Sequence, residues 1–158
     1  MYKSMVRIHL EYANSVWHPY RIGLLYDLEK VQKRATKILP ACRNKSYEER
    51  LRYLDLPTLA FRRNRGDMIE VYKILSQTYD PAVSVNLERD VDRRTRGNSK
   101  KLKAIRSRYD IRKYTFSVRT VNLWNSLSDE VVTAESVNSF KNRLDKLWEK
   151  QEIKYNWN

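Results

Sequence analysis

The clearest helical pattern in the chain is the stretch 23-GLLYDLEKVQKRATKIL-39. Its apolar residues recur every three or four positions, and they are Leu24, Leu28, Val31, Ala35 and Ile38. This spacing predicts an amphipathic α-helix whose apolar stripe packs into a core, while the lysines and arginines between them face water. Pro40 ends the predicted helix, because proline cannot continue the hydrogen-bond ladder.

Amphipathic helices are also predicted before and after this stretch. In residues 1–17, the apolar face consists of Met5, Ile8, Tyr12 and Val16. In residues 57–77, the expected core face consists of Leu56, Leu59, Ala60, Met68, Val71, Tyr72 and Leu75. Ser46 and Glu49 form a capping-box signature, which predicts a short helix through Tyr53, between the stretch 23–39 and the segment 57–77.

The last third of the chain carries two more helix signals. Thr115 and Ser136 are the predicted N-caps of two helices. The second helix is expected to bury Val137, Phe140, Leu144, Leu147 and Trp148. These patterns divide the chain into a helical N-terminal part (1–77), a basic linker (78–114), a C-terminal helical segment (115–150) and a frayed tail (151–158).

Composition supports a mainly α-helical fold. The chain has 158 residues, with 4 Trp, 11 Tyr and 3 Phe among its apolar positions, which is enough for one core and too apolar for a disordered chain. Only 3 Gly are present, too few for a hairpin-rich β architecture. We therefore expect a bundle-like N-terminal part, a basic linker with a short strand or two, and two C-terminal helices.

Cysteine usage and hydropathy bound the compartment. Cys42 is the single cysteine, so an internal disulfide and a multi-cysteine metal site are excluded. No apolar run reaches the roughly 20 residues that a membrane helix needs. The sequence thus indicates an intracellular protein, nuclear or cytoplasmic, that is neither secreted nor in contact with a membrane.

Charge is the strongest functional signal. The formal net charge is +13, and residues 89–119 hold 12 Lys or Arg against three acidic residues, a local net of +9. A basic segment interleaved with aromatic side chains is typical of proteins that bind nucleic acids. The candidate phosphate contacts in this segment are Arg93, Arg94, Arg96, Lys100, Lys101, Lys103, Arg106, Arg108, Arg112 and Lys113, and Tyr109 and Tyr114 are candidates for base stacking.

A second basic cluster consists of Arg62, Arg63 and Arg65 on the predicted helix 57–77. One interpretation is a polar helix turn that faces water. The other is a phosphate-binding cluster in which Asp67 orients one arginine and the others reach the backbone of a nucleic acid.

Catalytic patterns are absent from the sequence. Two-metal polymerases and nucleases need converging carboxylates, and the nearest approach is Asp90-Val91-Asp92, which we interpret as local salt-bridge partners. His9 and His18 have no triad or zinc pattern around them, and three glycines cannot build a nucleotide-binding loop. We expect no enzyme activity, no metal and no cofactor.

Four collinear blocks resemble the C-terminal part of reverse transcriptases of non-LTR retrotransposons (LINE elements) of the jockey and chicken-repeat type. The blocks are 10-LEYANSVWHPYRIGLLYDLEKVQKRATKIL-39, 47-YEERLRYLDLPTLAFRRNRGDMIEVYKIL-75, 95-TRGNSKKL-102 and 116-FSVRTVNLWNSLSDEVVTAESVNSFKNRLDKLW-148. The chain departs from the family at Ser128, where proline is usual, and at Asn98, where histidine is common.

This resemblance implies a thumb and post-thumb helical module of an RNA-directed DNA polymerase from a mobile element. Such a module grips template RNA and primer during target-primed reverse transcription, as part of a ribonucleoprotein, next to the catalytic palm of the parent element. The palm and its Asp-Asp metal site have no counterpart in these 158 residues. The expected partner is RNA or an RNA–DNA hybrid, contacted through its backbone. Two alternatives stay open, a helical protein-interaction or assembly module and a decayed element without activity.

Overall fold

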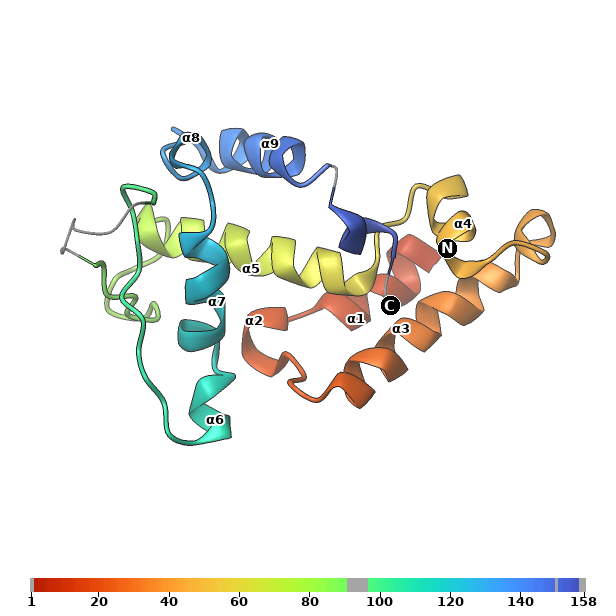
Figure 1. The fold of residues 1–158 in the computed structure, drawn as a ribbon, viewed down its shortest axis with the longest axis horizontal. Helices are drawn as coiled ribbons and strands as arrows, with labels where there is room; N and C mark the ends of the chain where they lie inside the picture. The colour runs from red at the N-terminus through yellow and green to blue at the C-terminus, as the bar shows by residue number, and fades with distance from the viewer. Residues whose placement is uncertain (1, 91–96, 150, 157–158) are drawn as a thin grey trace. The chain divides into compact units, whose positions relative to one another are not determined.

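A computed structural model of the chain describes residues 2–90, 97–149 and 151–156 and confirms the predicted mainly α-helical class (Figure 1). The longer helices are α3 (Ile22–Lys37), α4 (Tyr47–Tyr53), α5 (Leu59–Leu75), α7 (Phe116–Asn125) and α9 (Val137–Leu147). The shorter ones are α1 (Arg7–Glu11), α2 (Asn14–Trp17), α6 (Asp110–Lys113) and α8 (Asp129–Val132), with single π or 3₁₀ turns at Tyr2–Val6, Pro40–Cys42 and Glu152–Lys154.

The chain forms two compact units. Unit 1 consists of residues 1–64 and 148–158, and unit 2 consists of residues 65–147. The first residues of α5 belong to unit 1 and the rest to unit 2. The boundaries expected from sequence at 77, 114 and 150 mark where helical patterns stop, whereas the units depend on which side chains pack together.

Helix α3 packs into unit 1 through polar side chains. Its buried residues are Glu29, Gln32 and Thr36. The predicted core stripe is instead largely at the surface, because Leu24, Val31 and Ile38 are 50%, 37% and 77% exposed. The helix predicted here is therefore confirmed, but the prediction of which face enters the core is wrong.

The buried face of α3 is explained by the backbone groups that it satisfies. The Leu59 backbone N–H, at the start of α5, donates to Glu29 Oε2 at 3.0 Å, and the Tyr47 hydroxyl donates to the other carboxylate oxygen. The amide of Gln32 donates to the carbonyl oxygen of Pro57 at 3.0 Å. The first N–H groups of a helix have no partner within it, so a carboxylate from a neighbouring helix is a favourable cap.

The N-terminal stretch does not form the single helix expected over residues 1–17. It is interrupted between α1 and α2 at Ala13, which takes a left-handed φ of 49°. The apolar face predicted for it is exposed throughout, at Met5, Ile8, Tyr12 and Val16. That core prediction is also wrong, because helical spacing identifies an apolar face without identifying the element that covers it.

The end of the chain completes unit 1. The backbone N–H of Thr58 donates to the carbonyl oxygen of Lys154 at 2.9 Å, and the Thr58 hydroxyl donates to that of Ile153 at 2.6 Å. The rings of Phe61 and Trp148 meet edge to face, with centroids 5.9 Å apart. Residues 151–156, expected to be frayed, are thus held by hydrogen bonds and by packing.

Unit 2 has an apolar core that contains the predicted Met68, Val71, Tyr72, Phe140 and Leu144, whereas Leu147, also predicted to be buried, is 44% exposed. Its buried residues include Met68, Val71, Tyr72, Leu102, Phe116, Val121, Trp124, Leu127, Val131, Val132, Phe140 and Leu144. The Phe140 ring stacks on Tyr72, with centroids 4.4 Å apart, and lies 5.9 Å from Trp124. The Ser136 hydroxyl accepts a hydrogen bond from the Ser139 backbone N–H at 3.1 Å, which confirms the predicted N-cap of α9.

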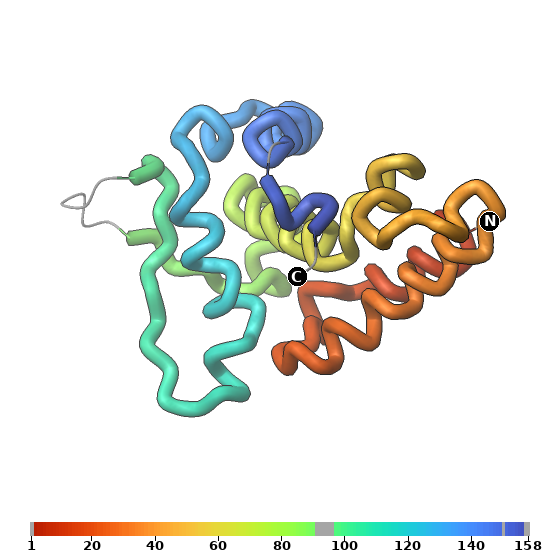
Figure 2. The backbone as a smooth tube through the Cα atoms, turned by 45° about the vertical axis from the view of Figure 1, so that its right-hand side comes forward, coloured from red at the N-terminus to blue at the C-terminus, as the bar shows by residue number. Residues whose placement is uncertain are grey.

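Residues 97–103 are fixed to α7 by paired hydrogen bonds. The buried side-chain amide of Asn98 donates to the carbonyl oxygens of Trp124 and Leu127, at 3.0 and 3.2 Å. Asn125 exchanges two bonds with the backbone of Leu102, at 2.8 and 2.9 Å. These contacts anchor the start of an extended run that continues to α6 (Figure 2).

The linker was expected to contain a short strand or two. Within its described residues there is only an isolated antiparallel bridge between Arg89 and Leu102. The strand prediction is therefore wrong for this part of the chain. Beside this bridge the Asp90 backbone N–H donates to the Lys101 carbonyl oxygen at 2.9 Å, while other backbone groups of residues 98–102 pair with side chains of α7 and with Asp129.

Candidate nucleic-acid interface

Arg62 and Arg63 contact other residues of unit 1. The Arg62 guanidinium forms a two-pronged ion pair with the carboxylate of Glu11. Arg63 is buried, donates from Nη2 to the Leu10 carbonyl oxygen at 2.9 Å, and lies 5.3 Å from the ring centroid of Trp17. Trp17 itself is 39% exposed. Both arginines thus hold α1 and α2 within unit 1, and their contact with phosphate stays a prediction.

Arg65 and Asp67 lie further along α5, in unit 2. The Arg65 guanidinium donates to both carboxylate oxygens of Asp145, at 2.5 and 2.7 Å, and this hydrogen bonding raises the pKa of Arg65. Asp67 is buried and forms a two-pronged ion pair with Arg119 of α7. Asp67 thus pairs with Arg119, and the hypothesis that it orients an arginine of the 62–65 cluster stays a prediction.

Lys100, Lys101 and Lys103 follow the anchored Asn98. Lys100 and Lys101 are half-buried, and the Lys100 ammonium lies 5.9 Å from the ring centroid of Tyr72. Lys103 is exposed and forms an ion pair with Glu88 at 3.2 Å. Exposed pairs of this kind contribute only about 0–1 kcal/mol to stability. Lys103 can therefore leave the Glu88 carboxylate and pair with a phosphate at little cost.

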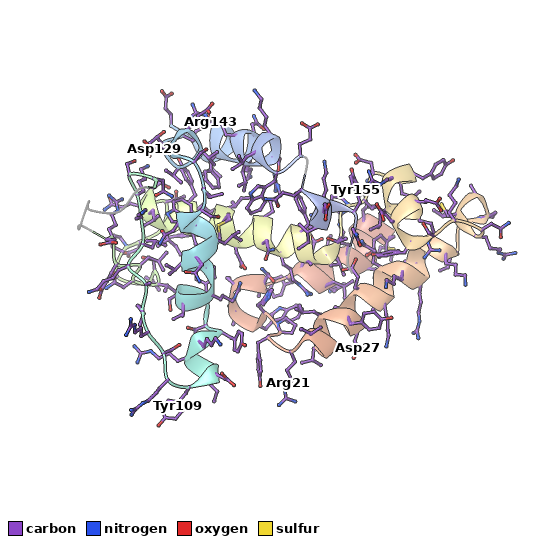
Figure 3. The ribbon with its side chains drawn as sticks, viewed as in Figure 1. Arg21, Asp27, Tyr109, Asp129, Arg143 and Tyr155 are labelled. Carbon is purple, nitrogen blue, oxygen red and sulfur yellow. The ribbon has the colours of Figure 1, made fainter. Side chains whose placement is uncertain are left out.

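The most open basic surface of unit 2 is formed by residues 103–114, which we call the basic loop. Its exposed cations are Lys103, Arg106, Arg108, Arg112 and Lys113, and its single acidic residue is Asp110. Tyr109 is 75% exposed and points away from the ribbon at the start of α6 (Figure 3). Tyr114 is half-buried, with the Lys113 ammonium 5.5 Å from its ring centroid. The structure thus brings cations and one open aromatic face together in a single segment.

The remaining predicted contacts are Arg93, Arg94 and Arg96. These three residues lie outside the part of the chain that the structure describes. The same is true of Val91 and Asp92 in the acidic triplet that begins at Asp90. Their roles stay predictions from the sequence.

Unit 2 also contains a cavity of about 460 Å³ at the C-terminal end of α5. Its lining mixes apolar and polar side chains, namely Ile74, Leu75, Gln77, Tyr79, Pro81, Ser84, Val85, Asn86, Leu87 and Arg89. The Arg89 guanidinium donates to the carbonyl oxygen of Leu75 at 3.3 Å. Nearby, the Tyr79 hydroxyl accepts a hydrogen bond from Lys73, and this bond raises the pKa of Lys73.

A polar cluster that no pattern in the sequence indicates is buried in unit 1. Burial raises the pKa of Glu29, and burial likewise raises the pKa values of Tyr47 and Tyr2, so both phenols stay neutral at physiological pH. The Tyr2 hydroxyl donates to the side-chain oxygen of Gln32 at 2.9 Å. Each of these groups has a hydrogen-bond partner that fixes helix positions, which is a structural role.

Two further kinds of site are absent from the residues that the structure describes, a metal-holding cluster and a membrane-spanning helix. Over residues 2–90, 97–149 and 151–156, no three His, Cys, Asp or Glu side chains are grouped in a way that could hold a metal ion. No helix within those ranges is long and apolar enough to cross a membrane. Comparison of the chain with protein-family models, with curated proteins and with solved structures found no match in any of the three.

Proposed function

We propose that this chain binds RNA or an RNA–DNA hybrid through the phosphate backbone, as the non-catalytic helical part of a reverse transcriptase of the non-LTR retrotransposon type. The observation that supports the proposal is the basic loop, where exposed arginines and the open ring of Tyr109 lie in one short segment of the chain. Arginine and lysine neutralise phosphates and release counterions, and an exposed aromatic ring stacks on any base. Binding of this kind is strong at low salt and reads little sequence.

Within the basic loop, we assign phosphate contacts to Arg106, Arg108, Arg112 and Lys113, and base stacking to Tyr109. These cations are exposed, whereas Arg62, Arg63 and Arg65 already hold carboxylates or carbonyl oxygens of their own unit. Arg93, Arg94 and Arg96 add to the same charged segment by sequence. Charge reversal at those three is expected to weaken binding equally for unrelated nucleic-acid sequences, because phosphate contacts carry no sequence information.

The first experiment titrates the purified chain with a hairpin RNA, an RNA–DNA hybrid and a DNA duplex over a range of salt concentrations. We expect affinity in the micromolar range or better, with log K falling by about 0.7 to 0.9 per phosphate contacted for each unit of log salt. The preferred substrate identifies template RNA or hybrid as the partner. Absence of binding to all three near physiological salt would contradict the proposal.

A matched pair of variants locates the interface. Arg108→Glu with Arg112→Glu is expected to weaken binding and to reduce the salt slope by about two phosphate contacts. The control, Lys141→Glu with Lys146→Glu, changes the net charge equally but lies on α9. Equal losses in both variants would show that net charge, and not the basic loop, carries the binding.

A further inference from the structure

The apolar stripe of α3 has the spacing of a coiled-coil seam, with Leu24, Val31 and Ile38 exposed and Leu28 and Ala35 half-buried. Its five residues, Leu24, Leu28, Val31, Ala35 and Ile38, alternate steps of four and three and so occupy d, a, d, a and d positions of a heptad repeat. At 100° per residue, the seam lies roughly 115° around the helix from the buried face of Glu29, Gln32 and Thr36. Helix α3 can therefore stay packed in unit 1 while its seam meets another helix.

The charges beside the seam fit a second copy of the same helix. Asp27 and Arg34 occupy the two g positions, and both are exposed. In an antiparallel pair the g positions of the two helices face each other, so Asp27 meets Arg34 of the partner subunit twice, once on each side of the two-fold axis. In a parallel pair, the g positions face e positions, which here are Leu25, Gln32 and Leu39, and no ion pair forms.

We propose that two copies of this chain associate antiparallel through α3. Leu28 packs against Val31 of the partner subunit, and Leu24 packs against Ala35 of the partner subunit. This register also aligns the first residue of α3, Ile22, with the last, Lys37 of the partner subunit, so it overlaps the whole helix. The seam, the two ion pairs and the helix length thus agree on one arrangement.

The expected dimer is weak. A helix of 16 residues is only ~24 Å long. An interface of this size belongs to the small, transient class, for which we expect a dissociation constant of about 10 to 100 µM. In each subunit Asp27 already contacts Lys30 at 3.0 Å, and this exposed pair is lost at little cost when Arg34 of the partner subunit approaches.

The test is sedimentation equilibrium of the full chain from about 1 to about 300 µM. Val31→Asp is expected to abolish association, because it places a charge in the centre of the seam. Ile22→Asp is the matched control, because Ile22 is 80% exposed on the same helix but lies off the seam. A chain that stays monomeric throughout this range, or equal effects of the two variants, would overturn the proposal.

Charge exchange tests the register. Asp27→Arg alone and Arg34→Asp alone should each weaken the dimer by about tenfold, because each turns two attractive pairs into two repulsive ones. The double variant restores opposite charges and should return to within about twofold of the original chain. A double variant as weak as the single ones would overturn the antiparallel pairing.

Disulfide trapping gives an independent answer about direction. Leu24→Cys and Ala35→Cys chains, mixed under mild oxidation, should form the mixed disulfide and little of either homodimer. A parallel pair gives the opposite result, since each position then meets its own copy. Cys42 is buried and serves as the internal control, because no disulfide should form through it.

Discussion

Asn98 shows how one buried side chain can organise a loop. Its amide donates to two carbonyl oxygens at the end of α7, and its oxygen accepts the Lys100 backbone N–H at 3.1 Å. The Trp124 carbonyl also accepts the Leu127 backbone N–H at 3.1 Å, so Asn98 adds a second bond there and supplies a donor to the Leu127 carbonyl just beyond the helix. The charge and spacing of the linker contain no sign of this role, because it depends on residues 26 and 29 positions later in the chain.

Replacing Asn98 by Ala should therefore destabilise unit 2. We expect a loss of about 2 kcal/mol, since two helix-end carbonyls are left buried without this donor. Urea unfolding followed by tryptophan fluorescence measures it, because Trp124 is buried in this unit. Asn122→Ala is the control, because Asn122 is exposed on the same helix. Similar losses in both variants would refute the role of Asn98.

The raised pKa of Glu29 predicts how the stability of the fold depends on pH. Burial raises its pKa above the usual 4.5, so the folded chain binds this proton more tightly than the unfolded chain does. Its contribution to stability is complete below pH 4.5 and is lost as the pH rises through the raised value. Tyr47, Lys33 and Arg63 act on the same carboxyl and lower its pKa, but burial outweighs them.

Glu29→Gln removes this titration. The stability of the original chain relative to the variant should fall as the pH rises above 4.5, as measured by urea unfolding at each pH. Glu49→Gln should behave in the opposite way, because the backbone and hydroxyl of Ser46 hold the pKa of Glu49 below its usual value. A difference between the chain and Glu29→Gln that stays flat or grows with pH would contradict the assignment.

Among the helices, α4 follows directly from sequence. Its capping box is complete, since the Ser46 hydroxyl accepts from the Glu49 N–H and the Glu49 carboxylate accepts from the Ser46 N–H at 2.7 Å. Ser46→Ala should cost about 1 kcal/mol of unfolding free energy. Glu48→Ala is the control, because it removes only an exposed contact with Arg52 and should cost less than about 0.5 kcal/mol. Circular dichroism during urea unfolding distinguishes the two.

Helix α3 marks the limit of sequence prediction. Its existence follows from the apolar spacing, but its orientation follows from Glu29 and Gln32, which cap and bridge backbone groups of other elements. The candidate interface divides in the same way. The positive charge of the basic loop and the exposure of its cations could be predicted from composition. The pairing of Arg65 with Asp145 could not, because it joins residues 80 positions apart. Spacing within a helix carries no information about such partners.

At the scale of the whole molecule, α3 differs from the helices of unit 2 in the chemistry of the face that it buries. Unit 2 buries aromatic and aliphatic side chains, while α3 in unit 1 buries three polar ones and exposes its apolar stripe. Local stability depends on buried apolar contact. We therefore expect backbone amides of α3 to exchange with deuterium faster than those of α7 and α9.

Hydrogen exchange read by mass spectrometry measures this difference. The experiment belongs at about 1 µM, where the dimer proposed above is dissociated. Raising the protein concentration should then slow exchange of the α3 amides in the original chain. In the Val31→Asp variant the exchange rate of α3 should not change with concentration. Equal protection of α3, α7 and α9 at low concentration would show that polar contacts stabilise unit 1 as well as apolar packing stabilises unit 2.

The discontinuity of unit 1 has a consequence for synthesis on the ribosome. Trp148 and the carbonyl groups that pair with Thr58 are translated 84 residues or more after Asn64, once every residue of unit 2 has been made. At 5 to 20 residues per second, this delay is roughly 4 to 17 s. Throughout that time the apolar faces of α1 to α3 are attached to a nascent chain whose own unit is incomplete. Cotranslational chaperones are therefore expected to engage α1 to α3 until Trp148 and the residues that pair with Thr58 have been made.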